Sequence, residues 1–191
     1  MTGKTHIAIG ITAALAVSSN QPVENRLILV LVSAISSLIP DLDHPKGKLN
    51  QKILLINNNF YRILFYLSLG FISIYLYYLM EIKAFLYLGI ISFLIGISSH
   101  RGFTHSIIGF LISLTIIKLC MGNFGVEYIY TGFTIGYVLH ILADLFTIKG
   151  VKLFYPLKNN ISFPIKIRTN SKIENIIFIL LGIVSIFLLL I

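Results

Sequence analysis

Seven apolar segments make up most of this sequence, and they constrain its fold more than any other feature. They cover residues 7–19, 27–39, 60–80, 84–99, 107–121, 128–146 and 175–191. A helix needs about 20 apolar residues to cross a bilayer, a length that segments 60–80 and 128–146 provide. The first two segments are shorter and interrupted by small polar residues, so we expect them to enter only part of the bilayer.

The composition favours a membrane protein over a soluble domain. Hydrophobic residues make up 57% of the chain and charged residues 12%, with a mean hydropathy of +0.91. A soluble domain needs more polar surface than this. Solid apolar runs also favour helices over the alternating strands of a membrane barrel. We therefore predict an all-α fold, a polytopic helical bundle of about five to seven membrane-embedded helices, some short or half-spanning. Residues 1–191 would form a single integral-membrane domain.

Basic residues are distributed unevenly between the two sides that these segments define. Twelve of the 15 Lys and Arg residues fall on the side of the N-terminus, and the other three are Arg26, Lys83 and Lys118. Because cytoplasmic loops carry the excess of Lys and Arg, we expect the N-terminal side to face the cytoplasm. The long connection at 147–174 would be a basic excursion on that side, in contact with anionic headgroups.

All five histidines and all three aspartates fall into four short clusters at the cytoplasmic ends of the segments. Ionisable groups beside apolar runs are costly and usually functional. Imidazole and carboxylate groups also bind divalent metals, so the clusters supply eight candidate metal ligands: His6, Asp41, Asp43, His44, His100, His105, His140 and Asp144. Nitrogen and oxygen donors of this kind suggest one or two zinc ions, with manganese or magnesium as other options.

In two of these clusters, the spacing of the residues supports metal binding. His140 and Asp144 are four residues apart, which places both side chains on one helix face. There they can share one ion or bridge two, although a polar core contact is the alternative. Asp41 and Asp43 would project the same way from an extended turn, and carboxylates that close repel each other unless a cation or proton lies between them. Helix capping explains one of them, and orienting His44 beside a metal is a second role for Asp43.

Arg101, His105 and Asp43 are the candidate catalytic residues. The planar guanidinium of Arg101 suits a phosphate or carboxylate, although contact with lipid headgroups would also explain it. His105 lies where a helix is expected to begin, and it could serve as a ligand or as a general acid or base. His6 alone would often be only interfacial, and we include it because it lies on the same side as the other clusters.

Taken together, these motifs resemble a known family. The Pro-Asp-Leu-Asp-His element at 40–44, the His-Arg-Gly-x-Thr-His-Ser element at 100–106, Thr5-His6 and the His140/Asp144 pair resemble the bacterial membrane-bound metal-dependent hydrolase family of the YdjM type. The resemblance implies a multi-pass protein of the bacterial inner membrane with a metal-dependent hydrolase site, and it supplies no substrate. The ligand types are more loosely similar to zinc phospholipase C and the P1-type nucleases.

Three functions fit these features. The first is a membrane-embedded hydrolase in which metal-activated water cleaves a phosphoester of a phospholipid or another lipid. The second is non-enzymatic metal or ion handling or transport, since intramembrane His and Asp also build ion paths. The third is nucleic-acid binding through the aromatic and basic residues of 147–174. Anionic lipid explains those residues more simply, so we expect membrane lipids and no nucleic acid as partners. The sequence predicts no oligomeric state.

Overall fold

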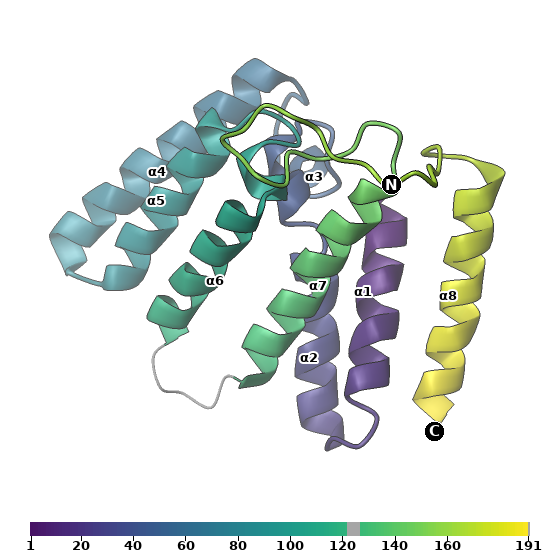
Figure 1. Cartoon of the computed structure of the whole chain (residues 1–191). Helices are drawn as coiled ribbons and strands as arrows, with labels where there is room; N and C mark the ends of the chain where they lie inside the picture. The colour runs from purple at the N-terminus through teal and green to yellow at the C-terminus, as the bar shows by residue number, and fades with distance from the viewer. Residues whose placement is uncertain (122–126, 191) are drawn as a thin grey trace.

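The computed structural model describes residues 1–121 and 127–190, in which helices and two short 3₁₀ turns are joined by loops (Figure 1). The elements in chain order are α1 Gly3–Val17, α2 Val23–Ser36, η1 Pro40–Asp43, α3 Asn50–Ile53, α4 Asn59–Met80, α5 Lys83–Ile97, η2 Phe103–His105, α6 Ile107–Met121, α7 Glu127–Leu145 and α8 Lys172–Leu190. Each predicted apolar segment is a helix, which confirms the all-α prediction. The predicted turn at 122–127 lies, except for its last residue, outside the described residues.

Three helical stretches are long and apolar enough to cross a membrane by length and composition: Val23–Asp43, Asn59–Met80 and Lys172–Leu190. Helices α1, α5 and α6 are apolar but shorter. The mixture of long and short helices confirms the predicted polytopic bundle. The second segment is longer than we expected, because η1 continues α2 as far as Asp43.

The bundle has two parts. Helices α1, α2, α6, α7 and α8 run side by side, whereas the α4–α5 hairpin slants away from them (Figure 1). Within the first part, α1 packs against α2, α7 and α8, and α2 packs against α7. The start of α1 and the end of α7 lie at one end of the bundle, and the segment between α7 and α8 lies over that end (Figure 1).

Small residues bring α1, α2 and α7 close together. A Cβ atom on Gly136 of α7 would collide with the backbone of Ser33 and the hydroxyl of Ser36 on α2. The Ser33 hydroxyl donates to the carbonyl of Gly10 on α1 at 3.0 Å, and the Ser36 hydroxyl donates to the carbonyl of Gly132 at 3.2 Å. Such contacts are typical of helix packing in membranes. Because Gly136 precedes His140 by about one turn, they also bring His140 to the end of α2.

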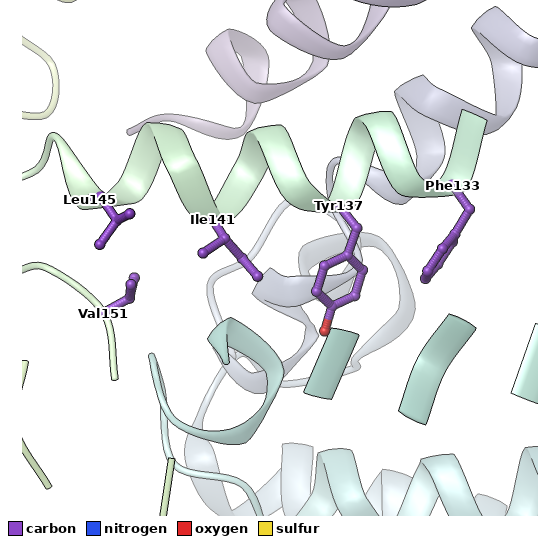
Figure 2. Close-up of a cluster of buried hydrophobic side chains, with 5 residues drawn as sticks. All are labelled: Phe133, Tyr137, Ile141, Leu145 and Val151. Atoms are coloured by element: carbon purple, nitrogen blue, oxygen red, sulfur yellow. The ribbon is translucent and has the colours of Figure 1, made fainter. Parts of the chain in front are cut away.

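A neighbouring face of α7 carries an apolar cluster. Figure 2 shows Phe133, Tyr137, Ile141 and Leu145 along one side of the helix, with Val151 facing Leu145. Tyr137 is buried, and its hydroxyl donates to the backbone carbonyl of Thr104 at 2.6 Å. This hydrogen bond attaches η2 to α7 at the residue that precedes His105.

Candidate metal centre

The four sequence clusters meet at one end of the bundle. They come from the start of α1, from η1, from η2 and from the last turns of α7. Five of the eight predicted ligands gather here, and we call them the donor cluster: His6, Asp41, His105, His140 and Asp144. They form two groups that share His140, one with His6 and Asp144 and one with Asp41 and His105. In each group, one donor atom per residue lies within 4.8 Å of the others.

The two central histidines present ring nitrogens to each other. His140 Nδ1 lies 2.7 Å from the backbone carbonyl oxygen of Ser37, which only accepts, so Nδ1 carries the hydrogen. His105 Nδ1 lies 3.2 Å from the Asp43 carboxylate, and the same reasoning applies. The Nε2 atoms are 3.2 Å apart, and in the neutral rings both carry lone pairs. Two facing lone pairs repel, so this arrangement requires a proton or a cation between them.

Carboxylates surround this pair. Asp41 Oδ1 lies 3.8 Å from the Nε2 atoms of both His105 and His140. Asp144 Oδ2 lies 3.8 Å from His105 Nε2 and 3.2 Å from the guanidinium of Arg101. Asp144 Oδ1 lies 2.6 Å from the amino group of Met1. Positive charge is therefore favoured at the centre of the donor cluster.

The ring nitrogens of His6 are the clearest candidates to bind a metal ion, because they are buried and have no hydrogen-bond partner among the described residues. Its side chain is 1% exposed and stacks on the His140 ring at a centroid distance of 3.8 Å. Nε2 lies 3.3 Å from Asp144, yet neither ring nitrogen has a partner in hydrogen-bonding geometry among the described residues. A buried polar group without a partner costs about 1–3 kcal/mol. The residues of the donor cluster therefore fit a divalent ion with mixed nitrogen and oxygen ligands, such as zinc.

Asp43 lies beside the donor cluster instead of within its two groups. Its oxygens accept hydrogen bonds from the Arg101 backbone N–H at 2.9 Å and the Thr104 hydroxyl at 2.6 Å. They also lie 2.9 Å from His100 Nδ1 and 3.2 Å from His105 Nδ1. Burial lowers the pKa of His105, but the carboxylates of Asp43, Asp144 and Asp41 together outweigh it and raise the pKa above its usual value. Asp43 thus orients two imidazoles, and a carboxylate in this position strengthens a metal-binding histidine.

The turn that carries Asp41 and Asp43 differs from the extended geometry that we considered. Pro40 pre-sets the start of a 3₁₀ turn, in which residues two apart do not share a face. Asp41 therefore meets His105 Nε2 and His140, whereas Asp43 meets His100 and the other ring nitrogen of His105. Asp43 does not orient His44 in this arrangement.

His44 and His100, the remaining predicted ligands, line the surface next to the donor cluster. Their rings are tilted toward each other at a centroid distance of 4.3 Å. His44 Nδ1 lies 3.2 Å from the backbone N–H of Lys46. Burial and the neighbouring His100 lower the pKa of His44. The side chain of His100 is 33% exposed, so one face of this pair is open to solvent.

Arg101 connects the loop before η2 to the end of α7. Its guanidinium donates to the Thr147 hydroxyl at 2.8 Å and to the Gly150 carbonyl at 2.7 Å, in addition to its contact with Asp144. Gly150 has a φ of 61°, a conformation that favours glycine. The guanidinium is thus held mainly by protein groups, although the residue also lines the cavity described next.

A cavity of about 680 Å³ opens beside the donor cluster. Asp41, His44, His100 and Asp144 line it together with Arg101 and four further basic residues, Lys46, Lys48, Lys149 and Arg168. Within the described parts of the chain, none of these four takes part in an ion pair. Five basic and two acidic side chains make this basic cavity complementary to an anion.

Glu174, which the sequence pattern did not indicate, anchors the start of α1 from α8. Its side chain is buried and accepts hydrogen bonds from the Thr2 backbone N–H at 2.6 Å and the Thr5 hydroxyl at 2.9 Å. It also accepts one from the Asn170 backbone N–H at 2.7 Å. These bonds hold the start of α1, where His6 lies. A lone acidic residue at a helix start is ordinary because of the helix dipole, so its pattern carries no signal of this role.

Comparison with known proteins gives the family. The family model described as YdjM inner membrane protein matches residues 1–191. The chain is 27% identical over 180 residues to uncharacterized protein YvsG of Bacillus subtilis, covering 93% of this chain and 87% of that protein. It is 27% identical over 163 residues to inner membrane protein YdjM of Escherichia coli, and equally to that of Shigella flexneri, covering 84% of this chain.

The chain spans 66% of the length of those two YdjM proteins, just under two thirds. No solved structure matches it significantly. The looser similarity to zinc phospholipase C stays a prediction, whereas the similarity to the YdjM type is confirmed along the whole sequence. This chain belongs to the YdjM inner membrane protein family.

Proposed function

We propose that this protein is a membrane-embedded metal-dependent hydrolase that cleaves a phosphoester of a phospholipid or another lipid. The observation that carries the proposal is the meeting of the donor cluster with the basic cavity. His6, His105, His140 and Asp144 are nearly fully buried, whereas Asp41 is 18% exposed and lines the cavity. An ion held by these groups would therefore be reached from a space suited to an anionic headgroup.

One or two divalent ions, most simply zinc, would supply Lewis acidity and an activated water in this site. His6, Asp41, His105, His140 and Asp144 would hold them. This assignment uses the unpartnered nitrogens of His6 and separates the facing Nε2 atoms of His105 and His140.

The residues around the donor cluster would bind substrate and move protons. Lys46, Lys48, Lys149 and Arg168 would hold the phosphate, since each lines the cavity and is exposed. Asp43 fixes Nδ1 of His100, so Nε2 is free to hold or accept a proton at the cavity. Arg101 would add positive charge there while keeping Asp144 in place. His105 is fully buried, which suits a ligand better than a proton donor to substrate.

The excess of Lys and Arg on the side of the donor cluster supports a site at the cytoplasmic face of the inner membrane, in a chain that crosses it several times. At that depth, the cavity would meet lipid headgroups. The nearby basic loops would be attracted to the anionic lipids of that leaflet.

The test combines metal analysis with turnover. The protein is purified in detergent, its metal content is measured by elemental analysis, and phospholipid hydrolysis is followed with and without chelator. We expect bound zinc or another divalent ion, and hydrolysis that is lost with chelator and restored by adding metal. The His140→Ala variant should lose both metal and turnover. Ser92→Ala, which removes a buried hydroxyl on α5, should keep both.

Other results would overturn the proposal. A protein without metal, or one whose turnover is unchanged by His140→Ala, would exclude metal-dependent hydrolysis. Bound metal with ion flux in proteoliposomes and no hydrolysis of any phosphoester would instead support metal handling or transport.

A further inference from the structure

A second hollow lies beside the basic cavity and differs from it in chemistry. It has a volume of about 390 Å³ and is lined by Ile7, Leu38 and Leu49 together with Lys48, Gln51 and Lys52. We call it the apolar groove. Lys48 and Gln51 also line the basic cavity, so the two spaces adjoin.

Lys48 stands where the two spaces meet. A Cβ atom placed on Gly3 would lie 2.9 Å from Lys48 Cγ and 3.3 Å from Leu38 Cδ2, so the stem of Lys48 lies close over the start of α1. The residue is exposed and, among the described residues, forms no ion pair. A lysine in this setting can place its methylenes against apolar surface and its ammonium in a polar space.

We propose that the apolar groove holds the hydrocarbon chain of an anionic lipid whose phosphate lies in the basic cavity, with Lys48 at the junction. This inference narrows the substrate of the proposed hydrolase to an anionic lipid. It rests on the proposed function, because hydrolysis of that lipid requires the metal-dependent site. Three observations select this occupant: the shared lining residues, the apolar side chains of Ile7, Leu38 and Leu49 that line the groove and not the basic cavity, and the membership of the chain in an inner membrane family. A water-soluble phosphate would fill only the cavity.

The size of the groove and its separation from other hollows support this assignment. Sites for small molecules commonly measure about 300–1,000 Å³, so this groove can take part of a chain. Another apolar hollow of about 340 Å³ lies between α5, α6 and the segment after α7, where Leu94, Phe103 and Tyr155 are among its lining residues. It shares no lining residue with the basic cavity, and it therefore serves as an internal control.

The first experiment uses the unmodified protein. Phosphatidic acid with a diazirine in its acyl chain is bound at a stoichiometric amount in detergent, activated by light, and the labelled residues are found by mass spectrometry. We expect labels at Ile7, Leu38 or Leu49 that excess unlabelled phosphatidic acid removes. Labels confined to the other apolar hollow, which Leu94, Phe103 and Tyr155 line, or to α8 would overturn the proposal.

The second experiment fills the groove. Leu49→Trp is compared with Leu55→Trp, since Leu55 is 97% exposed and does not line the groove. The affinities for phosphatidic acid and for glycerol 3-phosphate are measured with each variant, and metal content reports whether the centre is intact. We expect Leu49→Trp to bind phosphatidic acid about tenfold more weakly, or about 1.4 kcal/mol. Its affinity for glycerol 3-phosphate and both affinities of Leu55→Trp should change by less than about twofold, a few tenths of a kcal/mol.

The outcomes separate this inference from the proposed function. Equal losses for the two ligands, or no loss for either, would overturn the groove whether or not the protein hydrolyses lipids. The selective loss in a protein that hydrolyses nothing would support the groove while overturning the hydrolase. Because labelling needs no substitution, a Leu49→Trp variant that fails to fold leaves the first experiment decisive.

Discussion

Helices α7 and α8 have the same length, yet α8 is the more apolar of the two and the better candidate to cross a membrane, and they differ in how much of their surface is buried. Each has 19 residues, but α7 buries nine of them and α8 buries one. Each also contains one buried carboxylate, Asp144 near the end of α7 and Glu174 near the start of α8. Figure 1 shows α7 among its neighbours and α8 at the edge of the bundle, beside α1.

The partners of these two carboxylates predict different roles for them. Glu174 accepts hydrogen bonds from two backbone N–H groups and a hydroxyl, all neutral donors that belong to the fold. Asp144 faces ring nitrogens of His6 and His105, the Met1 amino group and Arg101. Burial alone therefore does not distinguish the two carboxylates, whereas, among the described residues, only Asp144 has neighbouring groups that could share a cation with it.

The largest difference should be in metal affinity. Replacing Asp144 with Asn keeps the side-chain volume but removes the charge and an anionic ligand, so we expect the affinity for zinc to fall by at least about 100-fold, or 2.7 kcal/mol. Zinc affinity is measured by competition with a chromogenic chelator. The matched replacement on α8, Glu174→Gln, should change it by less than about threefold, or 0.6 kcal/mol. Equal losses in the two variants would contradict the distinction between the carboxylates.

A smaller loss is expected at Asp43, which acts on the donor cluster through His105. Removing a group that orients a metal-binding histidine commonly lowers metal affinity about 10–100-fold, and we expect Asp43→Asn to fall in this range. The same chelator competition measures the change. Thr115→Ala, which removes an exposed hydroxyl on α6, should have no effect. Unchanged affinity in Asp43→Asn would mean that His105 needs no partner at Nδ1.

Much of the fold follows from pattern alone, and the reason is the cost of polar groups in lipid. Apolar runs that long have few alternatives to helices, and all seven predicted segments are helices. The second apolar segment, expected at 27–39, was too short at both ends: α2 begins at Val23, and Pro40, which would usually end a helix, begins the 3₁₀ turn that extends the span to Asp43.

The candidate site follows from sequence only in part. The grouping of His and Asp at the ends of segments predicted which residues would meet, because helix ends on one side of a bilayer are close in space. The sequence pattern could not separate the residues of the donor cluster from Asp43, His44 and His100, which lie beside it, because that division depends on the geometry of η1. The sequence pattern also did not predict the contact of His140 with the backbone carbonyl of Ser37 or the hydrogen bond from Thr2 to the distant Glu174.

Packing offers a third contrast between the two helices. A Cβ on Gly136 of α7 would collide with the backbone of α2, whereas one on Gly182 of α8 would meet nothing within 4 Å. We expect Gly136→Val to destabilise the protein by about 1–3 kcal/mol, as is usual for overpacking. Gly182→Val should leave stability nearly unchanged. Thermal unfolding in detergent measures both, and equal shifts would show that α2 and α7 do not need their close contact.

The smallest expected effect is on the stability of Glu174→Gln, and it tests whether Glu174 stabilises the fold and not metal binding. Glu174→Gln removes the charge that three donors share, and hydrogen bonds to a charged group contribute about 1.5–3 kcal/mol each. The remaining amide oxygen still accepts, so we expect a net loss of about 1–2 kcal/mol. Glu24→Gln, an exposed acid in the first turn of α2, is the control and should change little.

Chelation completes the comparison, because a ligand that binds only the folded protein stabilises it. Removing metal should lower the melting temperature of Glu174→Gln by as much as that of the unmodified protein, and should not lower that of Asp144→Asn. If Glu174→Gln instead became insensitive to chelator, the start of α1 and His6 would depend on α8 for metal binding. The carboxylate on α8 would then belong to the metal centre as much as the one on α7.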